Sequence, residues 1–185
     1  MKKFTFKRQL LFVMLMLLGC LSIQAADDGL ITNQVVITLD GPGTLPQKMS
    51  ASDKYRITNL KIKGDINGTD LGFIREMAGQ SINGIDETDG KLSTLDLSEA
   101  KIVSGGDYYY QDSNDTKYYT KDDELGVCAF SKCWGLKDIS LPGDLKSVGD
   151  FAFSDCSSLE TINLPSGITT IGNYAFDVMY LEPYN

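Results

Sequence analysis

The side chains best suited to molecular recognition are gathered in one stretch, residues 104–124. It holds five of the nine tyrosines, and six acidic residues against two lysines. Tyrosine offers a large, rigid contact area together with a hydroxyl group, and it is favoured in recognition loops. A long insertion of this kind binds a ligand, packs as a hairpin or is mobile. We predict the first, with these contact residues: Tyr108, Tyr109, Tyr110, Tyr118 and Tyr119.

Catalytic chemistry is poorly supported. The sequence contains no histidine, which excludes Ser-His-Asp and Cys-His catalysis and histidine-ligated metals. A glycosidase-like mechanism needs two carboxyl groups facing each other across a cleft, whereas the acidic residues here fall in segments typical of solvated loops and turns. We therefore expect no enzyme activity, no cofactor and no metal site.

The negative net charge of the chain makes some classes of partner unsuitable. The net charge is -8, and the first 25 residues carry four cations and no acid, so the remaining chain stands at -12. An acidic chain of this kind is ill suited to nucleic acid or to an anionic membrane surface. We expect a protein partner instead.

The amino terminus has the pattern of an export signal. A basic segment is followed by an apolar run too short to span a membrane, which predicts a signal peptide over residues 1–25. Cleavage after Ala25 would secrete the protein. Alternatively, Leu17–Cys20 resembles a lipobox, and a lipid on Cys20 would be the only membrane attachment. Both readings place the protein outside the cytoplasm, secreted or at the cell surface.

The cysteines beyond this segment are three: Cys128, Cys133 and Cys156. An odd number does not make a closed disulfide framework in an exported protein. Cys133 and Cys156 hold equivalent positions in a repeat, and we expect buried thiols that behave as small apolar groups. A disulfide bridge and a metal site are the alternatives.

A repeat organises the chain. Residues 125–147 and 148–170 are identical at nine of 23 positions, and a leucine pattern of the form L-x-x-L-x-L begins at Ile57, Leu92, Leu136 and Leu159. A period of this length with this pattern predicts a leucine-rich-repeat solenoid of the α+β class. The first two intervals between these starts are longer than the third, so two coils carry insertions, near 66–83 and 104–124. We divide the chain into a leader and capping strand (26–56), a solenoid (57–181) and a tail (182–185).

The same pattern predicts where side chains point. Strand residues alternate between two faces, and the outward positions of a concave parallel sheet are Lys61, Asp96, Ser140 and Asn163. The Ala-Phe pairs at 129–130, 152–153 and 175–176 predict a phenylalanine spine on the convex side. Asp70 is the expected N-cap of a helix over 71–78, and 35–39 the expected capping strand, one standard coil length before Leu60–Ile62. Because the repeat frame continues across it, removal of 105–123 is expected to leave the fold intact.

The units at 126–142 and 149–165, of the form G-x-x-A-F-x-x-C-x-x-L-x-x-I-x-L-P, resemble the BspA-type bacterial leucine-rich repeat. Upstream phrases such as Leu95–Ser98 resemble the amino-terminal region of exported members from Bacteroidetes. The resemblance implies a secreted or surface repeat protein without a catalytic site, and some relatives are adhesins for host matrix proteins. We expect a non-catalytic protein-binding or adhesion module. The alternative is a structural or capping segment, itself truncated, of a larger surface repeat assembly.

Overall fold

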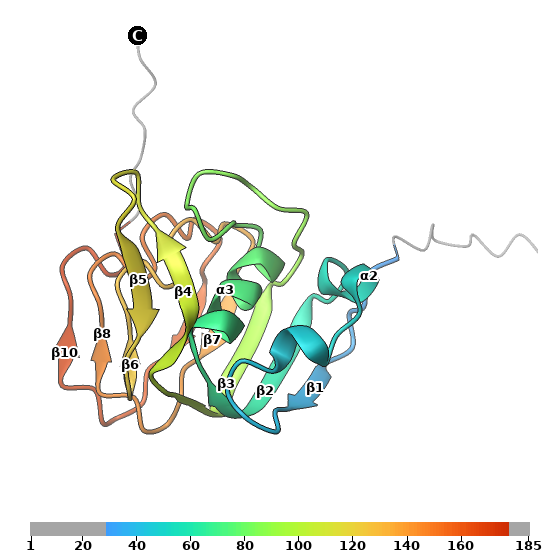
Figure 1. Ribbon diagram of the computed structural model, residues 1–185, viewed down its shortest axis with the longest axis horizontal. Coiled ribbons are helices and arrows are strands. Elements are labelled where there is room, and N and C mark those ends of the chain that lie inside the picture. The colour runs from blue at the N-terminus through green and yellow to red at the C-terminus, as the bar shows by residue number, and fades with distance from the viewer. Residues whose placement is uncertain (1–28, 178–185) are drawn as a thin grey trace, which may run out of the picture.

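Two parallel β-sheets, a helix and a hairpin enclose one apolar core in the computed structural model, which describes residues 29–177 (Figure 1). The predicted signal peptide 1–25, the lipidation candidate Cys20 and the tail 182–185 lie outside these residues. The strands are β1 (Val35–Thr38), β2 (Asn59–Ile66), β3 (Thr94–Ile102), β4 (Gly105–Gln111), β5 (Lys117–Thr120), β6 (Glu124–Leu125), β7 (Asp138–Ser140), β8 (Ser147–Val148), β9 (Thr161–Asn163) and β10 (Thr170–Ile171). The helical segments are η1 (Leu45–Gln47), α2 (Ala51–Lys54) and α3 (Gly68–Met77).

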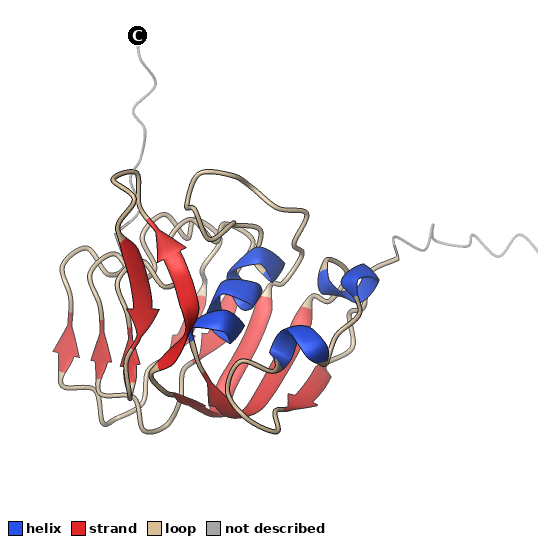
Figure 2. Ribbon diagram, in the orientation of Figure 1, coloured by secondary structure: helices blue, strands red, loops and turns tan. Residues whose placement is uncertain are grey.

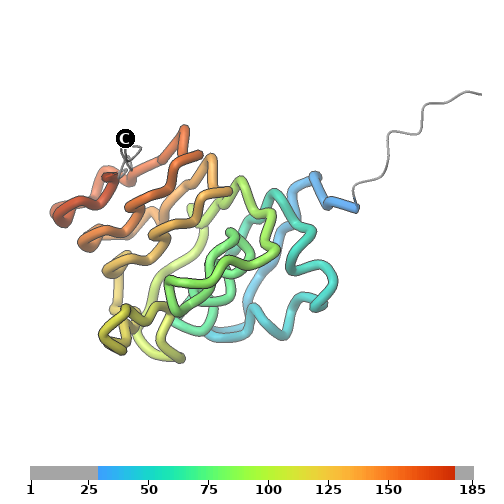
Figure 3. Tube along the Cα trace, turned by 90° about the horizontal axis from the view of Figure 1, so that it is seen from above, coloured from blue at the N-terminus to red at the C-terminus, as the bar shows by residue number. Residues whose placement is uncertain are grey.

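The larger sheet contains one strand from each leucine pattern. Its order is β1-β2-β3-β7-β9, and all four pairings are parallel. Asn59, Thr94, Asp138 and Thr161 lie side by side in register. Each of them is the third residue of its leucine pattern, which confirms the repeat frame. Viewed from above, the coils follow one another from the amino-terminal to the carboxy-terminal end (Figure 3).

The register of β1 differs from the prediction. Val35 pairs with Leu60 and Ile37 with Ile62, whereas the standard coil length places Ile37 opposite Leu60. The connection from β1 to β2 is not a standard coil, because it contains η1 and α2. A shift of two positions keeps the same side chains facing the core, since strand side chains alternate with a period of two.

A second sheet faces the carboxy-terminal part of the first. It consists of β6, β8 and β10, in which Leu125, Val148 and Ile171 occupy equivalent positions of successive coils and pair in register. Each short coil therefore adds one strand to each sheet (Figure 2). The repeat pattern did not reveal this sheet, because its strands are too short to show an alternation of apolar and polar side chains.

The Ala-Phe pairs form identical turns in successive coils. The ring of Phe153 lies between those of Phe130 and Phe176, with centroid distances of 5.6 and 5.4 Å. The residue before each pair, at 128, 151 and 174, has a left-handed backbone with φ between 54° and 56°. Three residues other than glycine adopt this rarely occupied conformation at equivalent positions, so we infer that packing of the coils on one another holds the turn.

Helix α3 covers the amino-terminal part of the larger sheet, where the second sheet is absent (Figures 1 and 2). It buries Leu71, Ile74 and Met77 in the core. The predicted N-cap is wrong: the helix begins at Gly68, and Asn67 caps it by accepting a hydrogen bond from the Thr69 amide at 3.0 Å.

The carboxylate of Asp70 lies inside the first turn of α3 instead. It accepts hydrogen bonds from the backbone amides of Gly43, Leu45 and Asn67. It is fully buried and ties the segment after β1 to the helix. A buried carboxylate is stable there because several backbone N–H groups solvate it.

Candidate functional site

The tyrosine-rich stretch is a packed hairpin. Strands β4 and β5 pair antiparallel, with Tyr110 opposite Tyr118. The hairpin lies against α3, and glycine makes this approach possible: a Cβ at Gly68 would overlap the carbonyl oxygen of Asp107. The loop is therefore part of the core, and this corrects the expectation that the fold is independent of residues 105–123.

Tyr109 was predicted to contact a ligand, but the structure buries its side chain. Its side chain is only 1% exposed, and its hydroxyl donates a hydrogen bond to the carbonyl oxygen of Val127 at 2.9 Å. Burial raises its pKa well above the ordinary value. The space for this ring comes from Gly126, where a Cβ would overlap the Tyr109 hydroxyl. Tyr109 joins the hairpin to the second sheet, and its buried side chain offers almost no surface to a partner.

The other four tyrosines lie nearer the surface. Tyr119 is 52% exposed and makes an edge contact with the Tyr108 ring, whose centroid is 4.5 Å from the Lys117 ammonium. Tyr110 and Tyr118 are half-buried, with ring centroids 5.7 Å apart. Burial raises the pKa of Tyr110 to about 12. Of the four, Tyr119 is the ring most available to a partner.

A groove of about 620 Å³ runs beside β5. Its floor includes Glu124, Ser147 and Thr170, which belong to β6, β8 and β10. The residues that follow the first two, Leu125 and Val148, are buried. Its volume lies in the range typical of ligand sites, about 300–1,000 Å³. Its wall contains these residues of the hairpin: Lys117, Tyr118, Tyr119, Thr120 and Lys121. Of the five predicted tyrosines, Tyr118, Tyr119 and the buried Tyr109 line the groove, whereas Tyr108 and Tyr110 do not.

Arg75 holds this region together, and the sequence analysis missed it. This fully buried side chain donates hydrogen bonds from Nη1 to the carbonyl oxygens of Cys128 and Ala129, at 2.7 and 2.9 Å. Its guanidinium carbon also lies 5.0 Å from the centroid of the Tyr110 ring, a cation–π contact. One signal was present in the sequence: Arg75 interrupts the apolar residues of a helix that packs on the core.

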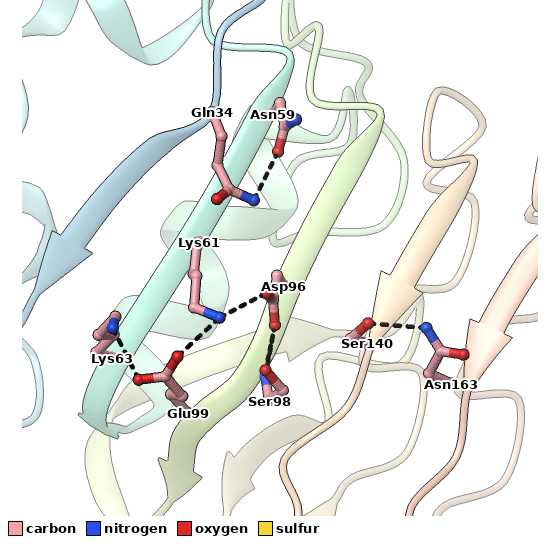
Figure 4. A network of polar contacts seen from close by, with 9 residues as sticks. All are labelled: Gln34, Asn59, Lys61, Lys63, Asp96, Ser98, Glu99, Ser140 and Asn163. Atoms are coloured by element: carbon pink, nitrogen blue, oxygen red, sulfur yellow. Dashed lines mark hydrogen bonds and ion pairs between the residues drawn. The ribbon is translucent and has the colours of Figure 1, made fainter.

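Lys61, Asp96, Ser140 and Asn163 lie side by side on the larger sheet and form two bonded pairs (Figure 4). Lys61 Nζ lies 2.8 Å from Asp96 Oδ2, and Asn163 Nδ2 donates to Ser140 Oγ at 3.0 Å. Glu99 extends the first pair, with carboxylate oxygens 2.9 Å from Lys61 and 2.8 Å from Lys63. The face is a network of satisfied charges without an aromatic anchor.

These contacts shift the protonation equilibria of the network. The hydrogen bonds to Asp96 and Glu99 raise the pKa of Lys61. Burial by itself would raise the pKa of Asp96, but hydrogen bonds from Lys61 and Ser98 outweigh it and lower that pKa. Hydrogen bonds from Lys63 and Lys61 lower the pKa of Glu99. All three groups are therefore held in their charged forms.

The three cysteines are free thiols. Cys133 and Cys156 are buried, and Cys128 is half-buried. Cys156 Sγ donates to the carbonyl oxygen of Phe130 at 3.0 Å. Burial raises the pKa of Cys133 to about 11, and it also raises the pKa of Cys156. Thiols of this kind are weak nucleophiles at neutral pH.

Within residues 29–177, no group of three or more cysteine or acidic side chains is arranged to hold a metal ion. Nor does any helix between these limits have the length and apolar character needed to cross a membrane.

Comparison with known proteins identifies the repeat. The family model described as "BspA type Leucine rich repeat region (6 copies)" matches residues 91–184, which is 94 of the 185 residues. No curated protein matches the chain. The match includes both sheets from β3 to β10 and the whole hairpin, and it agrees with the register of the short coils. The chain belongs to the BspA-type leucine-rich-repeat family.

Proposed function

We propose that the chain is a non-catalytic protein-binding module of an exported bacterial surface protein, and that its partner binds in the groove beside β5. Proteins with BspA-type repeats are typically found at the surface or secreted, and leucine-rich repeats generally mediate protein–protein contact. Adhesion to a host matrix or surface protein is the role that fits this setting.

The observation that carries the proposal is the position of Tyr119. Tyr119 is 52% exposed at the wall of the groove, and the Tyr108 ring contacts its ring edge-on. An aromatic ring that is held in place and exposed loses little conformational freedom on binding, and such rings are frequent binding hot spots. The outer face of the larger sheet offers no comparable anchor, since its charges already satisfy one another.

Direct binding to a panel of purified extracellular-matrix proteins tests this function. Tyr119→Ala should weaken the tightest interaction at least tenfold, about 1.4 kcal/mol. Tyr174→Ala is the matched control, because Tyr174 is an exposed tyrosine outside the groove. Equal loss in both variants, or none in Tyr119→Ala, would place the site elsewhere.

We propose two structural roles that support this module. Strand β1 caps the amino-terminal edge of the larger sheet, supported by the hydrogen bonds from Gly43 and Leu45 to Asp70. The stack formed by Phe130, Phe153 and Phe176 acts as a spine that holds successive coils in register.

Export through residues 1–25 remains part of the proposal. Membrane attachment through Cys20 is the alternative to secretion after Ala25. Cys20→Ala should release the protein from the membrane fraction if Cys20 is lipidated. An unchanged, soluble distribution of both forms would support cleavage after Ala25.

A further inference from the structure

The last described coil exposes positions that the preceding coil buries. Leu164 is 41% exposed, whereas Leu141, its equivalent in the preceding coil, is 3% exposed. Ile171 and Phe176 are 49% and 40% exposed, whereas their equivalents, Val148 and Phe153, are each 1% exposed. The repeat therefore places core-type side chains on a surface. Contiguous apolar surface of this kind marks an interaction site.

Two strand edges lie at the same end. β9 is the last strand of the larger sheet, and β10 is the last strand of the second sheet, among residues 29–177. Each edge presents backbone groups that pair readily with another strand. A hollow of about 240 Å³ opens beside β9, with Phe153, Ile162 and Phe176 in its lining. A fitting partner must present two strands at the spacing of the two sheets, together with apolar side chains. A single extended peptide would satisfy only one edge.

A second copy of this chain can present two such strands, but only through the same end. At the amino-terminal end the larger sheet finishes with β1, while the second sheet begins much later along the stack, at β6. The hairpin lies next to β6, and residues of β5 and β6 line the same groove (Figure 1). In head-to-tail stacking, the amino-terminal end of one copy would therefore offer only β1, whereas the other copy presents the two edges of β9 and β10.

We propose that two copies associate tail to tail around a twofold axis that runs across both sheets, just beyond the outer edges of β9 and β10. The rotation sets each strand antiparallel to its own copy, so one operation pairs both edges. Ile162 then faces Ile162 of the second copy, and Thr161 faces Asn163. Residues 160–164 and 169–172 contain a single charged side chain, Glu160, and this register places it beside Leu164 of the other copy. Between the paired strands, therefore, like charges do not meet, even though the chain is strongly acidic.

Sedimentation velocity on residues 26–185, at about 100 µM, tests the proposal, because association depends on protomer concentration. The chain should be a dimer, and both Leu164→Lys and Ile171→Lys should be monomers. These residues are exposed in the single copy, so the new charge does not enter a core, and circular dichroism will verify folding. Val36→Lys is the matched control: Val36 is an exposed apolar residue on the edge strand β1, and this variant should remain a dimer.

A cross-linking experiment gives an independent measurement. Paired antiparallel residues have Cα atoms about 4.5–5.5 Å apart, within the range that a disulfide bridges. Ile162→Cys should form a disulfide-linked dimer on mild oxidation, and Val36→Cys should not. If residues 26–185 are monomeric at the same concentration, the proposal is overturned. It is overturned even if a shorter variant that lacks residues 178–185 associates. Association that survives Ile171→Lys but not Val36→Lys would overturn it as well.

Discussion

Arg75 Nη1 donates a hydrogen bond to the carbonyl oxygen of Cys128 at 2.7 Å, across 53 residues of sequence. Helix α3, inserted in an early coil, thereby fixes the first Ala-Phe turn of the regular coils. The hairpin that carries the tyrosines lies against the same helix. The groove beside β5 consequently depends on a buried cation that lies outside it.

Replacement of Arg75 should destabilise the protein strongly. We expect Arg75→Leu to reduce the free energy of unfolding by about 3 kcal/mol, because two buried carbonyl oxygens lose charge-assisted hydrogen bonds. Arg75→Lys should recover little, since an ammonium does not reproduce the planar guanidinium. Chemical denaturation measures both effects. Arg56→Leu is the control, because Arg56 is exposed, and a loss as large as that of Arg75→Leu would contradict this role.

Phe153 should be the most sensitive position of the phenylalanine stack. We expect Phe153→Ala to cost about 3–5 kcal/mol, through lost burial and the cavity that remains. Phe176→Ala should cost clearly less, because its ring is partly exposed. The same denaturation experiment compares the two. A loss below about 1 kcal/mol for Phe153→Ala would refute the proposed spine.

Tyr109 should affect stability and Tyr119 should not. Tyr109→Phe removes the hydrogen bond to Val127 and should cost about 1 kcal/mol, whereas Tyr119→Phe should be neutral. Deletion of residues 105–123 should unfold the protein or greatly lower its stability, because it removes the Tyr109 ring from the core. A deletion variant with an unchanged melting temperature would show that the hairpin is not part of the core.

The outer face of the larger sheet should make stability sensitive to acid. A carboxyl with a lower pKa in the folded state stabilises the fold above its unfolded pKa, and this stabilisation is lost as pH falls through the folded pKa. The ordinary values for Asp96 and Glu99 are 3.8 and 4.5, so the loss should occur between about pH 5 and pH 3.

Melting temperatures across this range measure the effect. The double variant Asp96→Asn, Glu99→Gln should lose less stability on acidification than the original chain. Lys61→Met should behave similarly, because it removes the partner that both carboxyl groups share. Parallel melting curves for all three proteins would contradict the assignment.

The regular part of the fold was predictable because it repeats. Identities at a fixed spacing established the coil length, and the leucine pattern identified which strand residues point outward, including Lys61 and Ser140. These features are local, since strand alternation and the repeat frame follow from the sequence itself.

The candidate site was less predictable because it depends on contacts between distant segments. The inward direction of Tyr109 follows from the packing of the hairpin on α3, in a strand whose register is irregular between Gly105 and Tyr110. The partners of Arg75 lie 53 and 54 residues further along the chain. Asn67 and Asp70 are both good N-caps, and only the contacts of Asp70 with the segment after β1 decide between them.

Two serines provide the most direct test of the binding groove. Ser147 is on the groove floor in the second sheet, and Ser140 is on the outer face of the larger sheet; both are half-buried. Circular dichroism should first show that Ser147→Arg and Ser140→Arg are folded. The affinity of each variant is then measured for the matrix protein that the original chain binds most tightly. We predict that Ser147→Arg abolishes binding, because an arginine fills the groove, and that Ser140→Arg leaves the affinity unchanged. Loss of binding in Ser140→Arg alone would place the site on the outer face of the larger sheet and contradict the account.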